Sequence, residues 1–113
     1  MAQRWIDVGA VGTVGAAAPF ATEVEGTPIV IVRCEDGYRA VEDRCTHDGE
    51  PLEAAEVDAH ACEIICPRHG ARFCLKTGEA LSPPAYEPVQ TFAVRVEGGR
   101  VLVAVPGAHA PRA

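Results

Sequence analysis

Two short stretches decide the fold of this chain: Cys45-Thr46-His47 and, after eighteen intervening residues, Cys66-Pro67-Arg68-His69. Each stretch supplies one thiolate and one imidazole within a few positions of each other. Both groups are ligands for zinc and for iron–sulfur clusters. Two loops that each carry one cysteine and one histidine are therefore predicted to hold one metal centre between them. The candidate ligands are Cys45, His47, Cys66 and His69.

Two kinds of metal centre use two cysteines and two histidines. A [2Fe–2S] cluster has this ligand set when two histidines replace two cysteines on one iron. A closed tetrahedral zinc site uses the same residues, but its sequences usually show C-x₂₋₄-C and H-x₃₋₅-H blocks, whereas each block here pairs one cysteine with one histidine. The spacing favours the cluster. A structural zinc-binding module is the alternative from a different functional class.

Length and charge limit the other possibilities. A chain of 113 residues fits one domain, residues 1–113, which is expected to bury most of its apolar side chains in a single hydrophobic core. Its net charge is −6, and Lys and Arg are scattered along it, which argues against a nucleic-acid partner. An acidic carrier is instead steered toward basic docking patches on its partners, an effect that salt weakens.

The apolar pattern predicts many short strands and no persistent helix. The segments Ala21–Glu25, Pro28–Arg33 and Tyr38–Glu42 are separated by turn residues and predict a meander. Near the other end, Gln90–Glu97 alternates and is followed by Gly98-Gly99 and then by Arg100–Val105, which predicts a hairpin. The fold class predicted from the residues is all-β.

The rest of the chain reads as connections. Residues 43–85 carry all the candidate ligands and are rich in Gly, Pro and polar residues, as functional loops on a rigid scaffold are. Val8–Phe20 is expected to be a flexible connection after a first strand, Leu52–Val57 is a short helical fragment, and residues 106–113 form a tail. No stretch approaches the roughly 18 to 20 apolar residues of a membrane span, so no membrane partner is expected.

Five cysteines are an odd number, and three of them lie outside the two motifs. Small secreted domains usually pair an even number of cysteines, so the count favours a reducing cytoplasm. The three others, Cys34, Cys62 and Cys74, fall in strand-like stretches. We expect them to be free thiols that pack as small apolar side chains.

The pattern Cys45-Thr46-His47-x₁₈-Cys66-Pro67-Arg68-His69-Gly70 resembles the cluster-binding signature of Rieske ferredoxins, and Gly78–Ala85, with its Pro83-Pro84 pair, resembles their third, proline-rich loop. The resemblance covers nearly the whole chain. It implies the Rieske fold, an antiparallel β-sandwich base with an inserted cluster-binding subdomain at about residues 43–85. It also implies one [2Fe–2S] cluster, with the cysteines on the inner iron and the histidines on the outer iron near the surface.

This chain differs from the high-potential branch of that family. Proteins of that branch have similar ligand residues but carry one additional Cys in each ligand loop. Here those positions are Glu50 and Arg68. That branch also has a Ser and a Tyr that donate to sulfur, where this chain has Ala71 and Phe73. Fewer donors leave the reduced cluster less stabilised, so we expect a potential of roughly −100 to −150 mV, at the bottom of the Rieske range.

The resemblance implies a cytoplasmic one-electron carrier between an NAD(P)H-dependent flavoprotein reductase and a terminal oxygenase of the ring-hydroxylating type, with transient docking near the histidine ligands. A Rieske ferredoxin of another redox system, such as iron–sulfur cluster assembly, is the alternative. We find no nucleophile with a base, no phosphate-binding loop and no mononuclear iron triad in the sequence. The chain is therefore expected to be an electron-transfer component and not an enzyme.

Overall fold

The computed structural model describes residues 3–15, 18–46, 51–52, 55–67, 70–83 and 87–106. Within these ranges the chain is built from strands and one 3₁₀ turn, which confirms the predicted all-β class. In chain order the elements are β1 (Gln3–Ala10), η1 (Val11–Thr13), β2 (Phe20–Val24), β3 (Thr27–Cys34), β4 (Gly37–Glu42), β5 (Glu56–Asp58), β6 (Glu63–Ile65), β7 (Arg72–Cys74), β8 (Thr91–Phe92), β9 (Val94–Glu97) and β10 (Arg100–Pro106). No helix in these ranges is long and apolar enough to cross a membrane.

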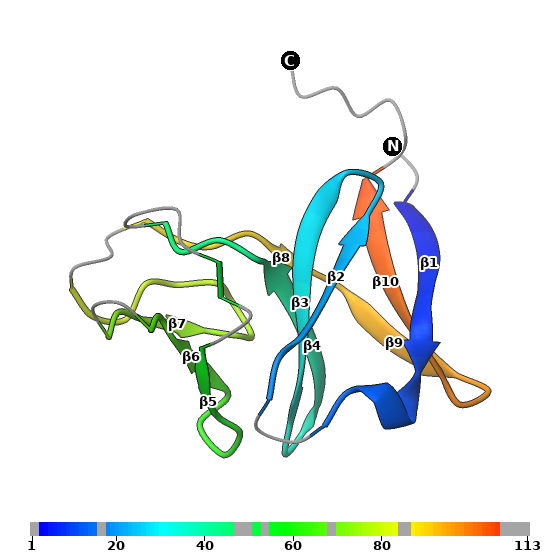
Figure 1. Cartoon of the computed structure of the whole chain (residues 1–113), viewed down its shortest axis with the longest axis horizontal. Helices are drawn as coiled ribbons and strands as arrows, with labels where there is room; N and C mark the ends of the chain where they lie inside the picture. The colour runs from blue at the N-terminus through cyan, green and yellow to red at the C-terminus, as the bar shows by residue number, and fades with distance from the viewer. Residues whose placement is uncertain are drawn as a thin grey trace.

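The strands form three sheets, and every pairing within them is antiparallel. Two sheets, with strand orders β1-β10-β9 and β2-β3-β4-β8, make up what we call the base. The third, β5-β6-β7, is the small sheet. The sheet that contains β3 lies between the other two (Figure 1). The molecule therefore has three layers, and its central layer contacts both of the others.

The central layer is made possible by β3, which is buried on both faces. Side chains alternate across a strand. Ile29 and Ile31 pack with Val101 and Val103 of β10 in the core of the base. The intervening side chains of β3, Val30 and Val32, belong instead to the core beneath the small sheet. A nearly continuous run of β-branched residues therefore gives one strand two apolar faces, as expected for a buried strand.

The predicted meander is confirmed. The terminal hairpin is confirmed in part, because its first strand is divided: Thr91–Phe92 (β8) pairs with β4, and Val94–Glu97 (β9) pairs with β10. β2, β3 and β4 follow one another with consecutive antiparallel pairing, and β9 pairs with β10 across the predicted glycine turn. The first turn differs slightly from the prediction, because Thr27 pairs with Val24 and the loop is Glu25-Gly26. Both loop residues have positive φ, at 53° and 87°, which is the backbone that a tight two-residue hairpin requires.

Two predicted connections are wrong. Within Val8–Phe20, Val8 to Ala10 belong to β1, where Gly9 pairs with Val101, and Val14 is a buried core residue. The segment is therefore fixed by pairing and packing at both points. The predicted helical fragment Leu52–Val57 is also wrong in its last two residues. These belong to strand β5, in which Val57 pairs with Ile64. The tail begins later than predicted, because Pro106 is the last residue of β10, and residues 107–113 lie outside the described ranges.

The prediction that Cys34 and Cys62 are free thiols is wrong, because the two form a disulfide. Cys34 ends β3 and Cys62 lies in the turn between β5 and β6, so the pairing depends on how the small sheet sits on the base. Their Cα atoms are 5.4 Å apart, within the usual range for a disulfide. Cys74 is a thiol at a half-buried position, as expected.

Gly78 anchors the turn that follows β7. Its N–H donates to the carbonyl of Cys74 at 2.7 Å, and its own carbonyl accepts from the N–H of Val89 at 2.8 Å. Its φ is +82°, and a Cβ placed there would lie 2.1 Å from the carbonyl oxygen of Val89. This position therefore requires glycine for two separate reasons, backbone conformation and close approach.

Gly78→Ala is expected to destabilise the protein by about 3 kcal/mol, because it adds a backbone collision to the cost of a left-handed residue. Gly26→Ala is the matched control: its φ is +87° and its added Cβ meets nothing within 4 Å. We expect that variant to lose only about 1 kcal/mol. Denaturant unfolding of both holoproteins measures the difference, and equal losses would contradict the close approach at Gly78.

Candidate metal centre

The two predicted cysteine ligands lie in one core. Cys45 follows β4, and Cys66 directly follows β6, so they come from different sheets. Their side chains are 0% and 1% exposed, and both belong to the apolar cluster beneath the small sheet. The disulfide joins Cys34 to Cys62 and involves neither of them. The structure thus places the two cysteines of the sequence motifs in the same apolar cluster.

The two predicted histidine ligands, His47 and His69, lie outside the described residues, and so do Glu50 and Arg68. The described residues that flank them are Thr46 and Gly70.

The first ligand loop is closed at its base by Asp43. The N–H of Asp43 donates to the carbonyl of Pro28 at 2.9 Å, which holds the loop to β3. The carboxylate of Asp43 accepts a hydrogen bond from the N–H of Leu52, so both sides of the loop meet there. The Thr46 hydroxyl, next to Cys45, donates to the carbonyl of Glu87 at 2.7 Å. Three separate parts of the chain are thereby joined around one ligand.

The second ligand loop is closed by two hydrogen bonds of its own backbone. The N–H of Cys66 donates to the carbonyl of Ala71 at 2.8 Å, and the N–H of Gly70 donates to the carbonyl of Cys66 at 3.0 Å. Gly70 has a φ of 76°, a conformation that side chains disfavour. The loop between Cys66 and Ala71 is therefore tight, with its ends fixed on the small sheet.

The third loop begins as an extension of the small sheet. Phe73 forms a bridge with Ala80, and the N–H of Leu81 donates to the carbonyl of Arg72 at 2.7 Å. The N–H of Arg72 in turn donates to the Ser82 hydroxyl at 3.1 Å. The side chain of Leu81, in the same pairing, is 42% exposed. Pro84 and Ala85 lie outside the described residues.

The positions that carry sulfur donors in the high-potential branch are filled here by apolar side chains. Ala71 and Phe73 are both 0% exposed and belong to the same core as the two ligand cysteines. Neither side chain has a hydroxyl, so neither donates a hydrogen bond to sulfur. The surroundings that the sequence predicts for these two positions are therefore present in the structure.

The donor set fits an iron–sulfur cluster. Two buried thiol side chains in an apolar core are soft ligands shielded from water, which is the environment that cysteine-ligated clusters occupy. Cys74, which is not a predicted ligand, differs from them: burial opposes ionisation of its thiol, but hydrogen bonds from Thr77 and from the backbone of Lys76 outweigh it and lower its pKa. Cys74 is thus a half-buried thiol on the small sheet, outside the ligand motifs.

A second group of candidate ligands was not predicted from the sequence. The sulfurs of Cys34 and Cys62 and the carboxylate of Asp36 lie within 4.8 Å of one another. In the structure the two sulfurs are bonded to each other, and Asp36 pairs with Lys76 and Arg39. Sequence reasoning missed the group because its members come from different sheets, and no spacing motif connects them.

Comparison with known proteins agrees with the motifs. A family model for the Rieske [2Fe-2S] domain matches residues 4–93. The 3-phenylpropionate/cinnamic acid dioxygenase ferredoxin subunit of Shigella flexneri serotype 5b is 36% identical over 90 residues, which are 79% of this chain and 84% of that protein.

Two solved structures resemble the whole fold. The ferredoxin of carbazole 1,9a-dioxygenase from Nocardioides aromaticivorans IC177 has a TM-score of 0.81 and 30% identity, and the match covers 87% of this chain and 96% of that one. A chain in a complex of reduced oxygenase and oxidized ferredoxin in carbazole 1,9a-dioxygenase has a TM-score of 0.80 and 33% identity, over 88% of this chain and 92% of its own length.

Cys45→Ser and Cys66→Ser are each expected to abolish stable iron binding, because a hydroxyl is a poor ligand for the iron that a thiolate holds. Bound iron and sulfide per chain and the visible absorption measure the loss. Cys74→Ser is the matched control, since Cys74 lies outside the ligand motifs, and it should keep full iron content. Equal loss in all three variants would mean that the fold, and not ligation, had been damaged.

Proposed function

This chain belongs to the Rieske [2Fe-2S] domain family, and from that premise we propose that it is the ferredoxin of a ring-hydroxylating dioxygenase system. A [2Fe–2S] cluster is its cofactor, and its role is to carry electrons. In the proposal it takes single electrons from an NAD(P)H-dependent flavoprotein reductase and passes them to a terminal oxygenase. The observation that supports this most is the burial of two cysteines from separate loops in one apolar cluster, in a chain that matches dioxygenase ferredoxins over most of its length.

The proposed ligands are divided between the two irons. Cys45 and Cys66 would hold the inner iron, and their burial supports this assignment. His47 and His69 would hold the outer iron. Thiolates are anionic and stabilise ferric iron, whereas neutral imidazoles donate less charge. The bound cluster supplies a one-electron couple whose added electron is then expected on the histidine side.

The proposed cluster-binding subdomain spans about residues 43–85 of a single domain. In support, this range contains β5, β6 and β7, which pair with one another and share no ladder with the base. The range begins with Asp43, which closes the first loop against Leu52. Docking near the histidines is part of the proposal, and the exposed side chain of Leu81 in the third loop is one apolar group that a partner could contact.

The proposed partners follow from the relatives and from charge. One similar solved structure is described as a complex of oxygenase and ferredoxin, which supports an oxygenase as the acceptor. The net charge of −6 suits basic docking patches on both partners. A cytoplasmic location is proposed because NAD(P)H-dependent reductases draw on a cytoplasmic pool. A Rieske ferredoxin of another redox system, such as cluster assembly, remains the second candidate.

Ala71→Ser is expected to raise the midpoint potential by on the order of 50 mV, because a hydroxyl donor to sulfur stabilises the more negative reduced cluster. Ala40→Ser is the matched control: Ala40 is also buried, but it packs in the core of the base. The midpoint potential of the Ala40→Ser variant should equal that of the unsubstituted protein. If neither variant shifts the potential, the missing donor at position 71 is not what sets it.

Reconstitution tests the proposed partners. The holoprotein is combined with the reductase and terminal oxygenase components of the cell that produces it, and substrate-dependent NAD(P)H oxidation is followed. We expect turnover only when all three components are present, and a several-fold decrease as the salt concentration rises, because the encounter is electrostatic. Full turnover without this chain, or with the iron-free Cys45→Ser variant in its place, would contradict the proposal.

A further inference from the structure

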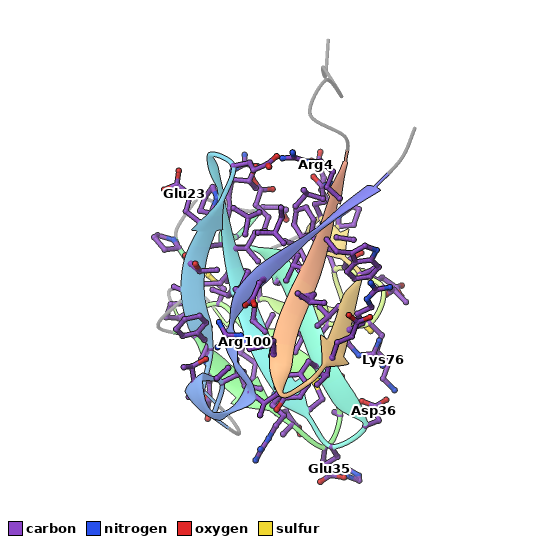
Figure 2. All side chains as sticks on the ribbon, turned by 90° about the vertical axis from the view of Figure 1, so that its right-hand side faces the viewer. Arg4, Glu23, Glu35, Asp36, Lys76 and Arg100 are labelled. Carbon is purple, nitrogen blue, oxygen red and sulfur yellow. A yellow bond between two sulfur atoms is a disulfide. The ribbon has the colours of Figure 1, made fainter. Side chains whose placement is uncertain are left out.

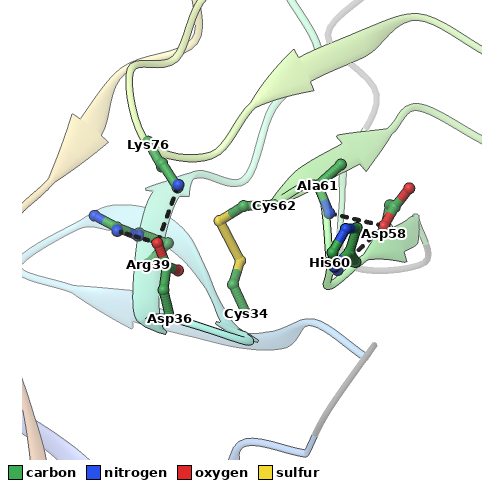
Figure 3. The surroundings of a disulfide bond; sticks show 8 residues. All are labelled: Cys34, Asp36, Arg39, Asp58, His60, Ala61, Cys62 and Lys76. Atoms are coloured by element: carbon green, nitrogen blue, oxygen red, sulfur yellow. Dashed lines mark hydrogen bonds and ion pairs between the residues drawn. A yellow bond between two sulfur atoms is a disulfide. The ribbon is translucent and has the colours of Figure 1, made fainter.

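The disulfide between Cys34 and Cys62 is the covalent bond that joins the base to the small sheet. Cys34 is the last residue of β3, and Cys62 lies in the turn between β5 and β6, 28 positions later. Figure 3 shows the bond crossing directly from the end of the β3 strand to that turn. The half of the protein that holds the ligand loops is therefore tied to the base through a bond that is sensitive to reduction.

Three polar contacts lie around the disulfide at this junction. The N–H of Glu35 donates to the carbonyl of Ala59 at 3.0 Å. The ring of His60 lies 3.0 Å from the carboxylate of Glu35, with side chains 85% and 65% exposed. Lys76 pairs with Asp36 at 3.0 Å, also in an exposed position. Glu35, Asp36 and Lys76 lie at one end of the molecule, away from Arg4 and Glu23 (Figure 2).

Exposed ion pairs of this kind add little stability. The hydrogen bond between Glu35 and Ala59 is a single main-chain contact. Val30 and Val32 of β3 also pack in one apolar cluster with residues of the small sheet, so the disulfide is the covalent part of a junction that packing also holds.

The backbone at Cys62 is strained. Its φ is 59°, in the left-handed region that residues with a side chain rarely adopt. Two interactions hold it there: the bond to Cys34, and a hydrogen bond from the N–H of Leu75 to the carbonyl of Cys62 at 2.9 Å. Opening the disulfide would remove one of the two and free the turn to relax.

That turn leads directly to a ligand. β6 follows Cys62 and ends immediately before Cys66. The two disulfide cysteines and the two proposed ligand cysteines, Cys45 and Cys66, also belong to one apolar cluster. The disulfide and the ligand sulfurs are therefore packed in the same core. A change of conformation at the disulfide is therefore transmitted along one short strand, and through shared packing, to the metal centre.

The disulfide itself is buried, with Cys34 4% and Cys62 1% exposed. A partly open cavity of about 380 Å³ lies beside it. Its lining residues are Arg33, Cys34, Glu35, Gly37, Tyr38 and Ala59. Cys34 lines this cavity and Cys62 does not. A thiolate that enters the cavity is therefore directed to Cys34, and it reaches the buried sulfur when the turn opens locally.

We propose that Cys34 and Cys62 form a second redox site, a two-electron disulfide–dithiol couple that a small or protein dithiol reductant opens and that controls how firmly the ligand-bearing small sheet is held to the base. One thiolate of the reductant attacks the sulfur of Cys34, the bond to Cys62 breaks, and the Cys62 thiolate takes up a proton. The second thiolate of the reductant then displaces Cys34, which also gains a proton. Two electrons and two protons pass to the chain, and the reductant becomes a disulfide.

The first test is alkylation of the native holoprotein with iodoacetamide, followed by peptide mapping, with and without dithiothreitol. Without dithiothreitol we expect Cys74 to be labelled, as an internal control, while Cys34 and Cys62 stay unlabelled. With dithiothreitol both should become labelled while the visible absorption of the cluster persists. Full labelling of Cys34 and Cys62 before reduction would overturn the proposal.

Two further outcomes of that experiment would also overturn it. Resistance of the pair to dithiothreitol until the protein unfolds would show a purely structural bond. Zinc bound by Cys34, Asp36 and Cys62 in the protein as purified would show a metal site in place of the disulfide.

The second test is amide hydrogen exchange, with the N–H groups of Glu35 and Leu75 as reporters, since each donates across the junction or to Cys62. In the unsubstituted holoprotein, dithiothreitol should raise exchange at both positions at least tenfold. The Cys34→Ser, Cys62→Ser double variant should exchange at the fast rate with or without reductant, and Cys74→Ser should behave like the unsubstituted protein. Unchanged exchange on reduction of the unsubstituted protein would contradict control of the junction.

Discussion

Burial of β3 on both faces is the constraint on which the rest of the structure depends. Ile29 and Ile31 join the base, whereas Val30 and Val32 form part of the floor beneath the small sheet. Each apolar face is stabilising only when another layer covers it. The small sheet has three short strands and would be marginal alone. Packing of the small sheet on β3 therefore holds in place the loops that carry the proposed metal ligands.

The ligand loops are fixed by hydrogen bonds that connect separate parts of the chain. Asp43 closes one loop and the Cys66–Ala71 pair closes the other, while Thr46 ties the first loop to the segment that follows the third. Such closure lets loops carry function on a rigid scaffold. The interior of the same region is apolar, with alanine and phenylalanine at the two positions where hydroxyl donors would raise the potential. Apolar side chains at these two positions are consistent with the proposed low potential.

The sequence predicted the fold class, the meander and the terminal hairpin, because these depend on alternation and turn residues along the chain. It did not predict the pairing of Cys34 with Cys62, since that depends on how two sheets meet. The strand at Glu56–Asp58 was missed because three residues carry too little periodicity to distinguish a strand from a helix. The order of Val8–Ala10 was missed because its glycine suggested a flexible segment, whereas pairing with β10 fixes it. The histidine ligands and the partners remain predictions.

The central claim is that this chain carries one electron on a low-potential cluster held by two cysteines and two histidines. An EPR-monitored redox titration of the purified holoprotein tests it most directly, because one experiment reports both the kind of centre and its potential. The account predicts a rhombic signal from a reduced [2Fe–2S] cluster, one electron per chain, and a midpoint near the bottom of the Rieske range, at about −150 mV. A midpoint well above zero would contradict the argument from Ala71 and Phe73. A colourless, EPR-silent protein with one zinc per chain would contradict electron transfer altogether.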